Sequence, residues 1–525
     1  MLDCSRDAVM KPEKVKEFAK MISDMGYNML QLYTEDTYEI TGEPFFGYMR
    51  GRYSQEELKD IDAYCKSIGV ELVPCIQVLA HLNQLVQWEE YKPMFDCNDI
   101  LMVGDEKVYN LIEKMFQTVT TCFSSKRVNV GMDEAHMLGR GQYLEKNGYQ
   151  KRVDILAAHL KRVKEIADKY GVTLMMWSDM FIRINNDGHY YGENIRIPKE
   201  TIDSAPEGIE LIYWDYYSKD KVRYDQMLRT HSDFKNPIAF AGGFWTWYGF
   251  APNLRFALDA TEAAMRSVDN FQVDTVFFTM WGDDGKECSF YAQLPVIFAA
   301  SQMAKGNFDR ENIAKQFEAI YGYSFAEFMN LELTNCLRDE ESNTNNPCKY
   351  FLYNDPFIGR FDYTVSEDLP GCYKEAADVL KGSINGRAYD YLFEVQEKLS
   401  EVLAGKCDLG KRIRRAYELD DRNCLQQIAE EEIPELIHKM REFFDAFKRM
   451  WLKENKAFGL EVHEQRFGGL LYRMEGCANR LKSYLEGEIS KIDELEEACL
   501  VPYGKEEGKL TKNNQWMKMV TTSVL

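Results

Sequence analysis

The 525-residue sequence lacks the marks of a membrane protein, a metalloprotein or a nucleic-acid-binding protein. Its longest apolar runs, such as Leu294 to Ala300, reach about seven residues, whereas a membrane-spanning helix needs about 20. The 13 cysteines are scattered, without C-x-x-C pairs or other metal-site spacing. With 64 Lys+Arg against 85 Asp+Glu, the net charge is −21, which repels a polyanion. We expect no membrane span, no metal and no nucleic-acid partner.

Signals for a cofactor and for secretion are also missing. The sequence has no Gly-rich nucleotide loop and no H-E-x-x-H motif, and His136 has no partners at ligand spacing. The opening residues, MLDCSRDAVMKPEKV, contain no apolar signal segment, and an odd cysteine count fits reduced thiols. We therefore expect no cofactor and a cytoplasmic location. Because the chain opens directly on an expected strand, we also expect that an upstream segment, with any signal it held, has been lost.

What the sequence does contain is an alternation of apolar runs and amphipathic stretches over its first 305 residues, typical of repeated βα units. The runs are residues 1–4, 29–33, 71–78, 127–132, 173–177, 209–214, 238–245 and 275–281. Eight such runs predict an α/β fold, a closed (β/α)8 TIM barrel over residues 1–305. An open doubly wound sheet is the alternative, but the Gly-rich first turn expected of it is absent.

Helix signals separate the runs and then take over the chain. Ser54 and Glu57 form an S-x-x-E capping box, and Pro12 opens an apolar stripe that stops at Gly26. After about residue 305 the strand runs cease, and stripes such as Leu436 to Trp451 repeat at helical spacing. We expect an all-α C-terminal domain over residues 306–525, with these stripes as packing faces.

Polar and aromatic residues follow the strand runs, which is where a (β/α)8 barrel carries its active site. Tryptophans end four successive runs, and flat aromatic faces around carboxylates suit the C–H faces and hydroxyls of a sugar ring. The residues concerned include Arg6, Glu35, Asp36, His81, Asp133, Glu134, Trp177, Trp214, Trp245, Trp281 and Asp283.

The adjacent acids Asp133 and Glu134 follow the run RVNVGM. Strand alternation directs Asn129, Gly131 and Asp133 toward the barrel interior. Glu134 joins Asp133 at the mouth only if the chain has already left strand geometry, as expected at a strand end. The position of Asp133 and Glu134 at the end of a strand thus favours a functional role over a pair that is merely exposed to solvent.

These segments resemble glycoside hydrolase family 20, the β-N-acetylhexosaminidases. VNVGMDEAH is similar to the family's H-x-G-G-D-E, LDCSR to its D-x-S-R, and LYTED to its second-strand acids. PCIQVLAH is similar to its P-x-x-x-x-x-G-H, and WGDDGKECS to its last-strand tryptophan and acid. The matches follow the family's order over residues 1 to about 290.

The sequence departs from the family pattern at three positions. Asn129 replaces the histidine, Met132 the second glycine, and Ala80 the glycine before His81. The set is most similar to a divergent intracellular branch that includes hexosaminidase D and certain bacterial exo-hexosaminidases. The segment LYNDPFIGRFD also resembles the C-terminal domain of that branch. The small α/β domain that usually precedes the barrel is not found in this sequence.

The resemblance implies an exo-acting retaining hydrolase of glycans with terminal β-linked GlcNAc or GalNAc. Two adjacent carboxylates cannot flank a glycosidic bond, and in this family the substrate's 2-acetamido oxygen is the nucleophile. Asp133 would then orient the acetamido group, and Glu134 would be the general acid and base. The resemblance further implies substrate-binding roles for Arg6, Glu35, Asp36, His81, Trp177, Trp214, Trp281 and Asp283, and a donor to the acetamido oxygen in Tyr216 or Trp245.

Two other functions remain open from the sequence. One is a glycosidase with two separated carboxylates, for example Asp133 and Asp283, which would not need a 2-acetamido group. The other is a sugar-binding protein without catalysis, against which the intact acid pair argues. Hydrolysis of matched aryl glycosides distinguishes all three.

Overall fold

The computed structural model describes residues 1–271, 273–336, 346–501 and 515–523. The chain divides into two compact units. The first, the barrel unit, holds residues 1–244, 257–280 and 296–309, and the second, the helical unit, holds residues 245–256, 281–295 and 310–525. The segments that follow the last two barrel strands therefore belong to the helical unit.

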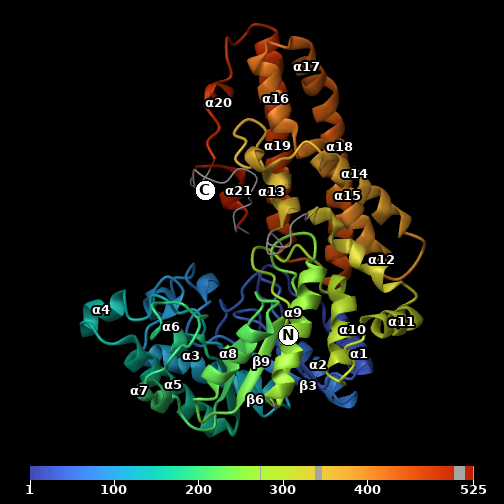
Figure 1. Ribbon diagram of the computed structural model, residues 1–525. Helices are drawn as coiled ribbons and strands as arrows, with labels where there is room; N and C mark the ends of the chain where they lie inside the picture. The colour runs from blue at the N-terminus through green and yellow to red at the C-terminus, as the bar shows by residue number, and fades with distance from the viewer. Residues whose placement is uncertain (272, 337–345, 502–514, 524–525) are drawn as a thin grey trace. The chain divides into compact units, whose positions relative to one another are not determined.

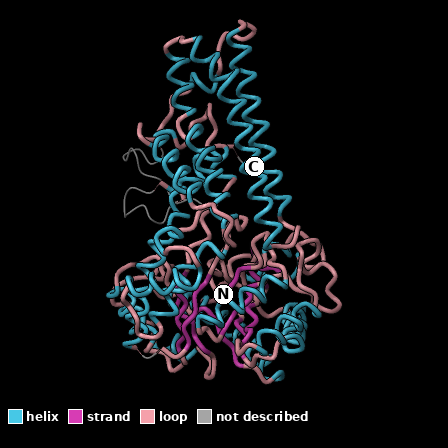
Figure 2. Tube along the Cα trace, turned by 90° about the vertical axis from the view of Figure 1, so that its right-hand side faces the viewer, coloured by secondary structure: helices cyan, strands magenta, loops and turns pink. Residues whose placement is uncertain are grey.

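The barrel unit is built on one parallel sheet, which within the described residues has eight strands in the order β1-β2-β3-β6-β7-β8-β9-β10. Figure 2 shows these strands at the centre of the unit, with helices around them. The strands are β1 (Leu2–Asp3), β2 (Met29–Tyr33), β3 (Glu71–Cys75), β6 (Arg127–Asn129), β7 (Thr173–Trp177), β8 (Glu210–Trp214), β9 (Ile238–Gly243) and β10 (Thr275–Thr279).

The sheet closes on itself between its first and last strands. Leu2 and Met280 form a parallel bridge, and the Asp3 amide donates to the Met280 carbonyl at 3.2 Å. This closure confirms the predicted barrel and excludes the open doubly wound sheet. Five runs end as strands earlier than predicted, at Asp3, Cys75, Asn129, Gly243 and Thr279. A two-stranded antiparallel hairpin, β4 (Phe95–Cys97) and β5 (Ile100–Leu101), was not predicted.

Helices follow the barrel strands as the capping signals indicate. Ser54 and Glu57 form the reciprocal capping box, and Gly26 ends the first helix with φ of 101°. The helices of this part of the chain are α1 (Pro12–Met25), α2 (Gln55–Ser67), α3 (Glu106–Cys122), α4 (Gln142–Asn147), α5 (Arg152–Tyr170), α6 (Asp179–Arg183), α7 (Lys199–Ser204), α8 (Lys221–His231), α9 (Leu254–Asn270) and α10 (Leu294–Met303).

The described part of the helical unit contains helices and no strand, in agreement with the predicted stripes (Figure 1). Phe443, Phe447 and Trp451 on α18 are buried against neighbouring helices. The helices are α11 (Arg310–Tyr321), α12 (Phe325–Met329), α13 (Pro347–Tyr353), α14 (Leu369–Gly382), α15 (Asp390–Lys406), α16 (Leu409–Glu418), α17 (Arg422–Gln427), α18 (Ile433–Glu454), α19 (Leu460–Leu485), α20 (Asp493–Glu496) and α21 (Met517–Val520). None of the helices the structure describes combines the length and apolarity needed to cross a membrane.

Inside the barrel, polar side chains bond across the sheet. Asn129 on β6 donates to the Gln31 amide oxygen on β2 at 3.2 Å, and β3 lies between these strands. The contact therefore crosses the barrel interior, as the alternation predicted for Asn129. At the opposite, amino-terminal end of β6, Arg127 pairs with Glu71 at 2.5 Å. Polar contacts thus tie the strands inside and at the amino-terminal end of the barrel, and in a barrel of this kind the active site is expected beyond the carboxyl ends of the strands.

Candidate active site

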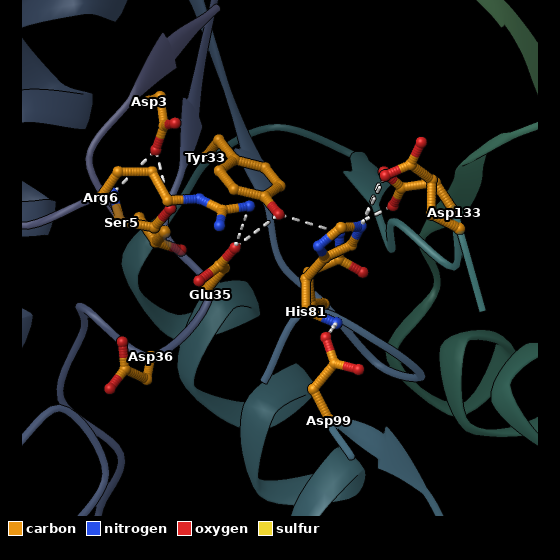
Figure 3. Close-up of polar contacts among 12 residues, drawn as sticks. Asp3, Ser5, Arg6, Tyr33, Glu35, Asp36, His81, Asp99 and Asp133 are labelled. Carbon is orange, nitrogen blue, oxygen red and sulfur yellow. Dashed lines mark hydrogen bonds and ion pairs between the residues drawn. The ribbon is translucent and has the colours of Figure 1, made fainter. Parts of the chain in front are cut away.

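Asp133 lies just past β6 and has two side-chain partners from the segment after β3. Gln77 Nε2 donates to Asp133 Oδ1 at 2.8 Å, and His81 Nε2 lies 3.3 Å from Asp133 Oδ2 (Figure 3). Burial opposes a charged imidazolium, but the charge and hydrogen bond of Asp133 outweigh it and raise the pKa of His81 to about 10. Burial likewise opposes the carboxylate, yet His81 keeps the pKa of Asp133 below its ordinary value. The two groups form an ion pair at neutral pH.

Glu134 turns away from strand geometry, as expected, because its φ is 53°. Its carboxylate has Oε2 3.9 Å from His81 Nε2 and Oε1 3.5 Å from Arg183 Nη2. The Glu134 side chain is 41% exposed, whereas that of Asp133 is 14% exposed. Asp133 is therefore the enclosed carboxylate and Glu134 the accessible one.

Gly131 makes the close packing behind this acid pair possible. A Cβ atom on Gly131 would lie 2.1 Å from the Gln77 amide oxygen, and the φ of Gly131 is 69°. The same Gln77 oxygen accepts the Met132 amide at 3.1 Å. Only glycine satisfies both the conformation and the space at this position.

A second acidic group lies after β1 and β2. Arg6 Nη2 pairs with Glu35 Oε1 at 3.0 Å, and the Tyr33 hydroxyl donates to the same oxygen at 2.9 Å (Figure 3). Gln77 Nε2 also reaches the Tyr33 hydroxyl at 3.1 Å. Burial raises the pKa of Glu35 above its ordinary value, although Arg6 and His81 act in the opposite direction. A polar chain thus runs from Arg6 to Asp133.

Asp36, predicted to bind substrate beside Glu35, is engaged by the protein itself. Its side chain is 1% exposed, and Arg50 Nε donates to its Oδ1 at 3.0 Å. Arg50 also donates to the Ser5 carbonyl. Burial raises the pKa of Asp36, with Arg50 opposing the shift. This ion pair fixes the segment after β2 against the segment after β1.

Aromatic residues after β7 and β8 are largely buried. Trp177 is 1% exposed and packs on Phe277, with ring centroids 5.9 Å apart. Trp214 stacks on Tyr216 at 5.3 Å with 21° between the rings, and Tyr190 contacts Trp214 at 4.7 Å. Trp214 and Tyr216 thus form one stacked pair at the end of β8.

Three candidates, Trp245, Trp281 and Asp283, belong to the helical unit. Trp245 is buried and stacks on Trp247 at 4.4 Å. Trp281 is partly exposed and Asp283 is exposed. The acids next in the chain are bound by helices of the same unit: Lys349 Nζ lies 2.9 Å from Asp284 Oδ2 and 2.7 Å from Glu287 Oε2.

Sequence reasoning missed several residues that build this site. Gln77 lies inside the PCIQVLAH segment and was a recognisable signal, as the polar residue in an apolar run. Asp99 accepts the His81 amide at 3.0 Å, and no motif marked it. Within the described residues, no group of three or more His, Cys, Asp or Glu side chains has the arrangement of a metal site.

A closed parallel barrel with a carboxylate pair, an arginine and tryptophans after its strands is the arrangement expected of a barrel-type glycoside hydrolase. The sequence profile described as "Glycosyl hydrolase family 20, catalytic domain" matches residues 1–223, and that described as "Glycoside Hydrolase 20C C-terminal domain" matches residues 324–515. The chain belongs to glycoside hydrolase family 20.

Individual relatives are distant. Hexosaminidase D of Bos taurus is 23% identical over 218 residues, which are 39% of this chain and 60% of that protein. Hexosaminidase D of Homo sapiens is 20% identical over 222 residues, 40% of this chain and 43% of that protein. The match thus spans less than two thirds of either relative.

Solved structures are similarly remote. A Bacteroides fragilis β-N-acetylhexosaminidase is 19% identical, with 61% of this chain and 68% of that chain covered and a TM-score of 0.47. A Vibrio harveyi exo β-N-acetylglucosaminidase, in complex with N-acetylglucosamine, is 14% identical, with coverages of 63% and 58% and a TM-score of 0.45. At these sequence identities and TM-scores, the structural similarity is no evidence about the reaction that this protein catalyses.

Proposed function

We propose that the protein is an exo-acting, retaining β-N-acetylhexosaminidase that releases terminal β-linked GlcNAc or GalNAc by substrate-assisted catalysis. The observation that carries this proposal is that one atom, His81 Nε2, lies within 3.9 Å of both the Asp133 and the Glu134 carboxylates. Because the imidazole occupies the space between them, a sugar ring cannot lie between the two acids as in a two-carboxylate glycosidase. This arrangement supports a nucleophile supplied by the substrate over one supplied by either of these two acids.

In the first step, Glu134 donates its proton to the glycosidic oxygen, and the bond from that oxygen to C1 breaks. The carbonyl oxygen of the substrate's 2-acetamido group attacks C1 and forms a cyclic oxazolinium ion. Asp133, kept anionic by His81, accepts the acetamido N–H and stabilises the positive charge. The enclosed position of Asp133 strengthens this interaction, because charges interact more strongly away from water.

In the second step, Glu134 is a carboxylate and accepts a proton from the attacking water. Water adds to C1, the oxazolinium opens, and the β configuration is retained after two inversions. The accessible position of Glu134 suits a group that meets both the leaving group and water. Arg6 and Glu35 bind the hydroxyls of the terminal sugar, while Trp177 and Trp214 line the acetamido and sugar surfaces. Of the two candidate donors to the acetamido oxygen, Tyr216 is the one that belongs to the barrel unit.

In this proposal, residues 1–305 are the catalytic barrel and residues 306–525 a helical C-terminal domain. The substrate is a glycan or glycoconjugate with a terminal β-N-acetylhexosamine. The 13 cysteines are free thiols among the residues that the structure describes, which fits the reducing environment of the cytoplasm.

Matched aryl β-glycosides with and without the 2-acetamido group test the proposal. We expect turnover of aryl β-N-acetylglucosaminide or galactosaminide, and no comparable turnover of the matching glucoside or galactoside. Equal rates on both members of a pair would overturn it in favour of a two-carboxylate glycosidase. Binding without hydrolysis of either would indicate a sugar-binding protein.

A further inference from the structure

Helix α6 directs two charged side chains at Glu134. Asp179 Oδ2 accepts the Glu134 amide at 3.1 Å and Arg183 Nε at 3.0 Å. Arg183 Nη2 then lies 3.5 Å from Glu134 Oε1. Residues 179 and 183 are four apart on the helix and share one face, so a single short helix holds both the backbone and the carboxylate of Glu134.

The backbone of Glu134 needs such support. Its φ of 53° lies in the left-handed region, which costs a non-glycine residue about 1–2 kcal/mol. The Asp179 side chain is fully buried, so its bond to the Glu134 amide is not weakened by water. Arg183 lies 3.5 Å from Oε1 and His81 lies farther from Oε2, at 3.9 Å, so we assign proton exchange with substrate to Oε2.

We propose that Asp179 and Arg183 are positioning residues that set the orientation of Glu134 and the charge around its carboxylate. This inference rests on the proposed function, since it concerns the group that we assign as general acid and base. Asp179 fixes the amide and the guanidinium, and Arg183 in turn fixes one carboxylate oxygen. Neither residue touches the reacting atoms.

Glu134 is surrounded by charged and titratable groups from several segments. His81 faces Oε2 from the segment after β3, Asp133 precedes Glu134, and His136 follows it; Asp179 and Arg183 face it from α6. A carboxyl group that loses a neighbouring cation keeps its proton to higher pH, and one that loses a neighbouring anion releases it at lower pH. Removing Arg183 or Asp179 should therefore have opposite effects.

The test is the pH dependence of kcat/KM for an aryl β-N-acetylhexosaminide in the Arg183→Met and Asp179→Asn variants of the full chain. We expect the alkaline limb of the profile to move up by about one pH unit in Arg183→Met and to move down in Asp179→Asn. Burial and nearby Asp133 raise the pKa of Asp179 to about 7, so its charge acts on the limb above that pH. Arg183→Lys should return the limb toward the wild-type position.

Arg223→Met is the matched control. Arg223 pairs with buried Asp215 after β8 at 2.8 Å, a pair of the same kind that is separate from the contacts of Glu134 with His81 and Arg183. It should lower the melting temperature without moving the limb. If both α6 variants lost rate with an unmoved limb, or moved it in one direction, their role would be only structural and the inference would be wrong. Acetamido dependence in the wild type, measured first, separates this failure from failure of the proposed function.

Discussion

Gln77 joins two neighbouring strand ends through Asp133: its amide nitrogen donates to Asp133 at 2.8 Å while its amide oxygen accepts the Met132 amide at 3.1 Å. A neutral amide that both donates and accepts suits this place, because a carboxylate there would repel Asp133. The bond orients Asp133 Oδ1 and leaves Oδ2 for His81. The whole arrangement depends on the absence of a side chain at Gly131.

We predict that Gly131→Ala disrupts the acid pair. The added Cβ would lie 2.1 Å from the Gln77 amide oxygen, so Gln77 has to move away from Asp133. We expect kcat/KM to fall by at least about tenfold, since small misplacements at a reacting group cost up to about 100-fold. Gly171→Ala is the control, because Gly171 has a similar φ of 65° with open space around it. Equal kcat/KM losses in both variants would contradict this explanation.

Neutralising Glu134 and neutralising Asp133 should reduce activity in different ways. Glu134→Gln removes the proton donor, a loss of about 10²–10⁴-fold that should shrink for aryl substrates whose leaving group needs no proton. Asp133→Asn keeps the donor but removes the charge that stabilises the oxazolinium. Its first step should slow even with good leaving groups. The measurement is kcat/KM across aryl glycosides of graded leaving-group pKa.

A stable cyclic mimic of the oxazoline extends this test. It should bind the wild type far more tightly than substrate, as analogues of high-energy states do. Asp133→Asn should lose most of that affinity, while Glu134→Gln should keep much of it. Identical leaving-group dependence in the two variants would show that Asp133 and Glu134 do not divide the roles as proposed.

The His81–Asp133 ion pair makes stability depend on pH. The pKa of His81 is raised from 6.5 to about 10, so its stabilising effect is complete below pH 6.5 and is lost as pH rises toward 10. The pKa of Asp133 is lowered from 3.8, so its effect is complete above that pH and is lost in more acidic solution. We expect the melting temperature of the wild type to exceed that of His81→Gln most between about pH 4 and 6.5.

The test is how the stability difference between the wild type and His81→Gln changes with pH. Above pH 6.5 the difference in free energy of unfolding should shrink, by up to about 1.4 kcal/mol per pH unit for one proton. Melting curves at intervals of half a pH unit measure it. A constant gap between wild type and His81→Gln from pH 6 to 10 would mean that His81 is not charged in the folded protein.

Arg6 and Arg50 pair with the adjacent acids Glu35 and Asp36, and replacing each arginine should have a different effect. Arg6 lies 3.0 Å from Glu35 and its side chain is 31% exposed, so it is available to substrate. Arg6→Met should raise KM at least about tenfold, since a hydrogen bond to a charged group contributes about 1.5–3 kcal/mol. It should lower the melting temperature less than Arg50→Met does, because Arg6 is 31% exposed and Arg50 is 14% exposed.

Arg50→Met should instead leave the buried Asp36 carboxylate without its cation. Loss of one partner of a buried pair costs about 3–5 kcal/mol, so the melting temperature should fall markedly. KM should change less than in Arg6→Met. A raised KM with an unchanged melting temperature would assign Asp36 to substrate binding after all.

The sequence predicted the barrel because each strand is a buried apolar run, and it placed Asp133 at the mouth because strand alternation has a period of two. It also identified the capping box at Ser54, whose bonds are local. Asp36 shows where such reasoning stops. Its position after β2 was predictable, but its partner Arg50 is 14 residues away in a segment without periodicity, so the ion pair could not be read from the sequence.

The residues that hold Glu134 and His81 in place could not be predicted from the sequence for the same reason. Arg183 reaches Glu134 from another strand end, 49 residues along the chain, and Asp99 reaches His81 from the hairpin β4–β5. No local pattern encodes contacts of this kind. The resemblance to a family indicated which residues to inspect, but the hydrogen bonds between them followed only from the folded chain.

Left-handed backbone at non-glycine residues recurs after three of these strands, at Glu35, His81, Met132 and Glu134. Met132 stands where the family pattern has glycine, and its φ is 71°. Each such residue costs about 1–3 kcal/mol, so the site stores conformational strain that the rest of the barrel has to offset. Selection for thermostability alone would therefore favour glycine or asparagine at these positions first. A variant stabilised in that way should have a higher melting temperature and a lower rate of hydrolysis. Substitutions that stabilise this enzyme without loss of activity are therefore expected in its helices and away from its strand ends.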